Sequence, residues 1–186
     1  MKKLCCSLST FFLVFALHTT VFALSLKVGD VQAEAKATFA DVADAPSSTD
    51  TTVYMIAAKG KGESKSNAKY YLYFVLAPKK DKVDKIYSFK KDPVKLTFAK
   101  NGVSKTLTFK VDKGSVNTIS DWNYMIVSRL LIKEVRDELV GITDLKIMLP
   151  LANGSYKTLV CPKTVTDGWD YVLTVDLDEV EKNANK

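Results

Sequence analysis

The fold of this 186-residue chain is decided by one stretch, residues 94–109, which reads VKLTFAKNGVSKTLTF. Apolar and polar side chains alternate on both sides of Asn101-Gly102. An Asn-Gly pair between alternating segments is a strong signal for a β-hairpin closed by a type I′ turn, in which both central residues are left-handed. The register that places apolar residues together on one face pairs Lys100 with Val103, Leu96 with Leu107 and Val94 with Phe109.

A second stretch repeats this pattern at residues 145–160, which read LKIMLPLANGSYKTLV. Both stretches contain Asn-Gly-x-x-Lys-Thr-Leu after an apolar-Lys-apolar triplet, and an aromatic segment follows each, beginning at Trp122 and Trp169. We therefore expect an internal duplication of a strand, hairpin, strand unit, with copies at residues 69–121 and 122–176. The second hairpin is expected to pair Ala152 with Ser155, Leu151 with Tyr156, Leu149 with Thr158 and Ile147 with Val160.

The repeat also decides between two interpretations of residues 121–139. Helix propensity and an acceptable N-cap at Asp121 favour one helix over the whole segment. Alignment with the segment that begins at Trp169, itself interpreted as a strand, favours a strand at residues 122–132, with a helical turn at residues 133–139. We adopt the strand. Further strands are expected where apolar residues alternate or cluster, at residues 31–39, 52–58 and 70–76.

These patterns predict an all-β protein with about ten strands and at most one short helix. The expected architecture is an antiparallel β-sandwich or open barrel. Residues 24–178 are expected to form a single β domain, because about 160 residues bury a sufficient core without covalent staples. Residues 179–186 are expected to be a flexible C-terminal tail.

The first 23 residues have the pattern of an export signal. Lys2 and Lys3 are followed by an apolar core at residues 11–17, and Ala23 supplies the small residue required for cleavage. We expect the cut after Ala23 and a periplasmic or secreted product. No later stretch approaches the roughly 18 apolar residues of a membrane span. The formal charge falls from +6 to +4 without the two lysines, and without an arginine cluster nucleic-acid binding is not expected.

Removal of residues 1–23 also removes the single histidine, His18, and two of the three cysteines, Cys5 and Cys6. Histidine-dependent nucleophilic catalysis, zinc binding and internal disulfides are therefore not expected, and neither is a cofactor. Cys161 is expected to be a buried small side chain, with intermolecular pairing as the alternative.

Carboxylates leave two kinds of chemistry to consider. Residues 176–179, Asp-Leu-Asp-Glu, come nearest to a calcium site, but they lack the glycine turn and the distal glutamate of a calcium loop. A hydrolase with a carboxylate pair needs no histidine, but its candidate acids are scattered over Asp121, Asp144, Asp167 and Asp170. We expect no enzymatic activity and no metal.

Two sets of residues are candidate binding sites. The loop that carries Lys59, Lys61 and Lys65 is expected to be mobile and could contact an anionic surface or an acidic glycan. Trp122 and Trp169 lie at matching places in the two copies and could stack on sugar rings or a peptide, although large aromatics at such positions usually belong to the core.

The expected function is an exported, non-catalytic binding or structural module. Its partner is unknown, with an anionic surface, a glycan or an envelope protein as the possibilities. The alternatives are a carboxylate-dependent hydrolase without histidine and a carrier of an apolar ligand between its sheets. A pocket with two acids would favour the hydrolase, and a large dry cavity would favour the carrier.

Overall fold

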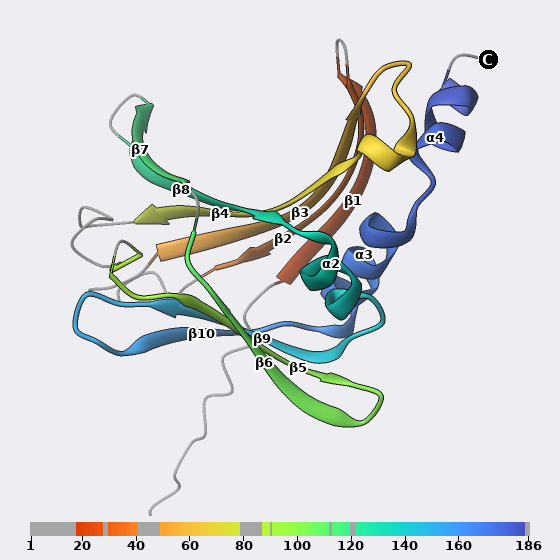
Figure 1. Cartoon of the computed structure of the whole chain (residues 1–186). Helices are drawn as coiled ribbons and strands as arrows, with labels where there is room; N and C mark the ends of the chain where they lie inside the picture. The colour runs from red at the N-terminus through yellow and green to blue at the C-terminus, as the bar shows by residue number, and fades with distance from the viewer. Residues whose placement is uncertain are drawn as a thin grey trace, which may run out of the picture.

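The computed structural model describes residues 18–27, 30–40, 49–78, 87–89, 91–111, 113–119 and 122–184. In this part of the chain most residues lie in two antiparallel sheets, which face each other in a sandwich-like arrangement (Figure 1). The larger sheet is strongly curved and the smaller sheet lies beneath it. The expectation of a mostly β protein is therefore confirmed.

The larger sheet has the strand order β1-β2-β3-β4-β8-β7. Its strands are β1 (His18–Lys27), β2 (Asp30–Phe39), β3 (Thr49–Gly60), β4 (Lys69–Pro78), β7 (Lys113–Ile119) and β8 (Trp122–Leu131). The expected strands at residues 31–39, 52–58 and 70–76 fall within β2, β3 and β4. Along β2 and β3 every second side chain is buried, as alternation requires of a sheet with one covered face.

The smaller sheet contains both Asn-Gly hairpins. Its order is β10-β9-β5-β6, with β5 (Val94–Lys100), β6 (Val103–Phe109), β9 (Thr143–Pro150) and β10 (Tyr156–Val160). The β5–β6 register agrees with the expected pairs, and Asn101 and Gly102 both have positive φ, at 52° and 75°. This first hairpin is confirmed.

The second hairpin differs from the expectation by one residue. Tyr156 pairs with Pro150 instead of Leu151, and only Gly154 of the turn has a positive φ, at 83°. The reason is a longer loop: Asn153 Oδ1 accepts from the backbone N–H of Ser155 at 3.0 Å, and Leu151 N–H donates to the Ser155 carbonyl at 2.9 Å. The side chain of Asn153 thus organises a loop with one more residue than a two-residue I′ turn.

The described part of the chain also contains three α-helices and a short 3₁₀ helix, η1 (Lys65–Asn67). The α-helices are α2 (Lys133–Leu139), α3 (Lys163–Thr174) and α4 (Leu177–Ala184). Strand β8 followed by α2 confirms the preferred interpretation of residues 122–139. The expectation of at most one short helix is wrong, and so is the strand expected at Trp169, which lies in α3. Residues 177–184 form α4, where a flexible tail was expected from Glu179.

Helix α3 provides much of the core beside the larger sheet. Its buried residues Val165, Trp169, Val172 and Leu173 recur at helical spacing, so they lie on one face. That face packs against β2 and β3 and also reaches β9 of the smaller sheet. Figure 1 shows α3 and α4 along the β1 side of the larger sheet. None of the helices in the described ranges is long and apolar enough to cross a membrane.

Candidate functional site

The three lysines of the expected binding loop have different environments. Lys59 lies in β3 with its side chain only 1% exposed, Lys61 is exposed at the following turn, and Lys65 begins η1 with 60% of its side chain exposed. The segment is therefore a structured turn docked against the C-terminal helix, where a mobile solvated loop was expected. This placement removes Lys59 from the surface that could meet a partner.

The ammonium group of Lys59 is held by three oxygens, each 2.7 Å away. They belong to the Glu63 backbone carbonyl and to the carboxylates of Asp178 and Glu181 on α4. An ammonium has three N–H donors, so this set satisfies it fully. We call the arrangement of Lys59, Glu63, Asp178 and Glu181 the Lys59 latch.

The charges of the latch reinforce one another. Burial alone would lower the pKa of Lys59, but hydrogen bonds to Asp178 and Glu181 outweigh burial and raise this pKa above its ordinary value. The pKa of each carboxyl is lowered, chiefly by its hydrogen bond with Lys59. All three groups are therefore charged at neutral pH, and the buried cation has both counter-ions beside it.

The two tryptophans do not form a pair of equivalent positions. Trp169 is 1% exposed in α3, so no ring face is available at the surface. Trp122 begins strand β8, which β3 and β4 separate from β2 in the larger sheet. One residue lies in a strand and the other on a buried face of a helix, so the two tryptophans do not occupy equivalent structural positions.

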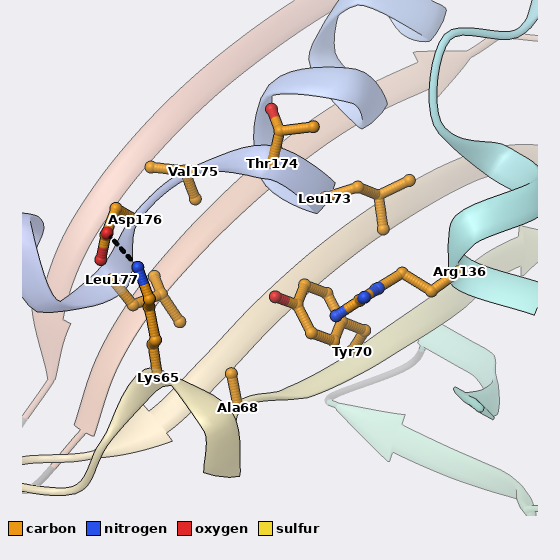
Figure 2. Close-up of a pocket in the computed structure, with 9 residues that line it drawn as sticks. All are labelled: Lys65, Ala68, Tyr70, Arg136, Leu173, Thr174, Val175, Asp176 and Leu177. Atoms are coloured by element: carbon orange, nitrogen blue, oxygen red, sulfur yellow. Dashed lines mark hydrogen bonds and ion pairs between the residues drawn. The ribbon is translucent and has the colours of Figure 1, made fainter. Parts of the chain in front are cut away.

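A pocket of about 280 Å³ lies beside the Lys59 latch (Figure 2). It forms where η1, β4, α2 and the link between α3 and α4 meet. Its lining residues are Lys65, Ala68, Tyr70, Arg136, Leu173, Thr174, Val175, Asp176 and Leu177. The walls thus combine apolar side chains with the charged groups of Lys65, Arg136 and Asp176.

Each end of the pocket carries a cation next to a carboxylate. At one end, Lys65 Nζ lies 2.5 Å from Asp176 Oδ2, and at the other the Arg136 guanidinium lies 5.0 Å from the centre of the Tyr70 ring (Figure 2). Arg136 also donates from Nε and Nη2 to Asp137 Oδ1, at 3.0 and 2.7 Å. At 5.0 Å from the ring centre, the guanidinium is within range of a cation–π interaction with the Tyr70 ring.

These pairs fix the ionisation of the pocket. The pKa of Arg136 is raised, first by its hydrogen bond with Asp137, and the pKa of Lys65 is raised, first by its hydrogen bond with Asp176. The pKa of Asp176 is lowered, first by the same hydrogen bond with Lys65. Both cations therefore remain charged over the whole physiological range. Each cation already has a carboxylate partner, so the pocket offers a ligand the remaining N–H donors of Arg136 and Lys65.

The acids considered for hydrolysis occupy separate places. Asp167 pairs with Lys163 on α3, Asp170 accepts from the Gly141 backbone N–H at 2.9 Å, and Asp144 is exposed at the start of β9. Asp121 lies outside the described residues. Within the described ranges, no three His, Cys, Asp or Glu side chains are grouped so that they could hold a metal ion.

Cys161 follows β10 and is buried, with 8% of its surface exposed. Burial raises the pKa of its thiol to about 12, so the thiolate needed for exchange reactions is scarce at neutral pH. This location agrees with the expectation of a buried small side chain.

Sequence reasoning missed Tyr70 and Arg136 as site residues. They lie 66 residues apart in the sequence, on β4 and α2, and no local motif connects them. Asp176 was considered only as part of a calcium loop. Comparison with protein-family models, with curated proteins and with solved structures gives no match for this chain.

Proposed function

We propose that this protein is an exported, non-catalytic binding module of the periplasm or cell exterior. Its ligand is a small molecule, or the end of a peptide, that carries a carboxylate or similar anionic group on a short apolar body. The observation that carries this proposal is the pocket in Figure 2, where the Arg136 guanidinium lies over the Tyr70 ring and both apolar and charged side chains line the walls. Lys65 at the opposite end adds a second cation.

The chemistry of the lining supports this ligand class. A guanidinium presents several N–H donors in one plane and forms charge-assisted hydrogen bonds with a carboxylate. Leu173, Val175 and Leu177 offer apolar surface for the remainder of the ligand. A volume of about 280 Å³ suits a small ligand better than a polymer.

The pocket favours binding over hydrolysis. Carboxylate-dependent hydrolysis requires two acids across the scissile bond. The lining contains one, Asp176, and Lys65 holds its side chain in an ion pair.

We further propose that the two hairpins of the smaller sheet arose by duplication. Strands β5 and β9 are antiparallel neighbours, and Leu96 pairs with Ile147, its counterpart in the repeated triplet. Pairing of equivalent residues is what a local two-fold axis produces. The proposal covers the hairpins alone, because the aromatic segments that follow them form a strand in one case and a helix in the other.

The test of the pocket uses hexanoate as the probe. We expect hexanoate to bind the wild-type protein measurably, and hexanamide, which has the same shape without the charge, to bind at least tenfold more weakly. Arg136→Gln should remove the preference for the carboxylate. Arg129→Gln, at the other arginine of the chain, should leave binding unchanged, since Arg129 does not line the pocket. Titration by NMR or calorimetry measures these affinities.

Equal binding of hexanoate and hexanamide would show that the cations do not recognise the ligand. Retention of the carboxylate preference in the Arg136→Gln protein would assign recognition to another part of the molecule. Inorganic phosphate serves as a second probe, because it has the charge without the apolar body and separates the two contributions.

A further inference from the structure

The Lys59 latch lies outside the pocket, yet it holds two of the segments that form the pocket. Lys59 is absent from the lining, and so are Asp178 and Glu181. Asp178 and Glu181 belong to α4, whose first residue, Leu177, lines the pocket together with Asp176 just before it. The position of α4 therefore sets the position of this wall.

The same two carboxylates also bind the turn between β3 and β4. Glu181 Oε1 accepts from the backbone N–H of Gly62 at 2.9 Å, and Asp178 Oδ2 accepts from the backbone N–H of Lys65 at 3.3 Å. Each carboxylate thus uses one oxygen for Lys59 and the other for the turn. Because Lys65 itself lines the pocket, the latch joins two neighbouring parts of the wall, the turn and the start of α4.

The rest of the wall is held independently of the latch. Tyr70 lies in β4 between two neighbouring strands, and Leu173 is buried in the core face of α3. Arg136 is on α2 and is oriented by Asp137. If α4 moves away, only the part of the pocket formed by the turn and by residues 175–177 changes shape.

We propose that Lys59 is a positioning residue of the binding site: through Asp178 and Glu181 it fixes α4 and the β3–β4 turn, and so sets the pocket geometry that the ligand meets. This inference rests on the proposed function of the pocket. By thermodynamic linkage, a ligand that binds more tightly when Lys59 holds α4 and the turn together must in turn stabilise that arrangement.

The experiment compares hexanoate affinity in three variants with that of the wild type. Lys59→Met keeps the length of the side chain and removes its charge, so α4 and the turn lose their common partner, and we expect affinity to fall at least fivefold. Lys59→Arg keeps the charge and should recover part of the loss. Lys163→Met removes an exposed lysine that pairs with Asp167 on α3, away from the pocket, and should bind as the wild type does.

A second measurement needs no variant and covers the case in which Lys59→Met does not fold. Saturating hexanoate should slow hydrogen exchange at the Gly62 amide of the wild-type protein, although Gly62 does not line the pocket. Unchanged exchange there overturns the coupling.

The outcomes separate this inference from the function on which it rests. If the wild type binds hexanoate and the folded Lys59→Met protein binds it with equal affinity, the latch only stabilises the fold, and the inference is wrong. Absence of hexanoate binding in the wild type overturns both proposals. Weaker binding in Lys59→Met with partial recovery in Lys59→Arg supports the positioning role, because a purely structural role would not change the affinity of the folded variant.

Discussion

At the scale of single residues, Trp169 is the largest fully buried side chain among the residues whose burial the structure describes. Its ring lies on the face of α3 that packs against β2 and β3. Trp169→Ala should lower the free energy of unfolding by about 3–5 kcal/mol, because it removes a large buried ring and leaves a cavity. Tyr171→Ala, on the exposed side of the same helix, should lower the free energy of unfolding much less. Urea unfolding measures both values, and equal losses would place Trp169 outside the core.

Lys59 shows which part of a residue's environment can be predicted from sequence. Val53, Met55 and Ala57 alternate along β3, and the same alternation places Lys59 on their buried face. The burial of Lys59 could therefore have been predicted. Its partners could not, because Asp178 and Glu181 lie about 120 residues further along and only the packing of α4 brings them close.

At the scale of elements, both hairpin turns depend on a glycine with a left-handed backbone. Gly102 and Gly154 have φ of +75° and +83°, which strain a β-branched residue. Gly102→Val and Gly154→Val should each lower the free energy of unfolding by about 1–3 kcal/mol. Nothing lies within 4 Å of an added Cβ at either position. The expected loss of stability therefore comes from backbone strain and not from a steric clash.

The matched control is Gly102→Asn. Asparagine adopts the left-handed conformation more easily than other non-glycine residues. Gly102→Asn should therefore lower the free energy of unfolding clearly less than Gly102→Val does. Chemical denaturation of the three variants measures the differences. A Gly102→Val protein as stable as Gly102→Asn would show that the turn does not require a positive φ.

The repeat predicted the first hairpin well and misled the interpretation of the segment around Trp169. The β5–β6 register follows from the local chemistry of Asn101-Gly102 and from alternation, so the sequence suffices. In α3 the apolar residues Val165, Trp169, Val172 and Leu173 have helical spacing, which indicates a helix by itself. A strand at Trp169 is inconsistent with this helical period, and the structure shows that the period is the correct signal.

At the scale of the whole molecule, α3 connects the two sheets. It contacts β1, β2 and β3 of the larger sheet and β9 of the smaller one. The mostly β class could be predicted because alternation and turn residues are local signals. The pocket could not, because it needs the relative placement of η1, β4, α2 and the α3–α4 link, which only the packed core defines.

The predicted export cut has a structural consequence at the edge of the larger sheet. Strand β1 pairs with β2 from His18 to Lys27, and cleavage after Ala23 would leave only residues 24–27 of this edge strand. The edge of β2 at residues 34–39 would then lose its partner. If the cut follows Ala23, the exported protein therefore cannot contain the whole ten-residue strand β1.

We expect the exported protein to begin at Leu24, because Val21-Phe22-Ala23 provides the small residue at the cut. N-terminal sequencing together with the intact mass of the protein recovered outside the cytoplasm measures this directly. An exported protein that retains residues 18–23 would place the cut earlier and keep β1 whole. A protein that stays in the cytoplasm with residues 1–23 attached would contradict export itself, and the proposed compartment with it.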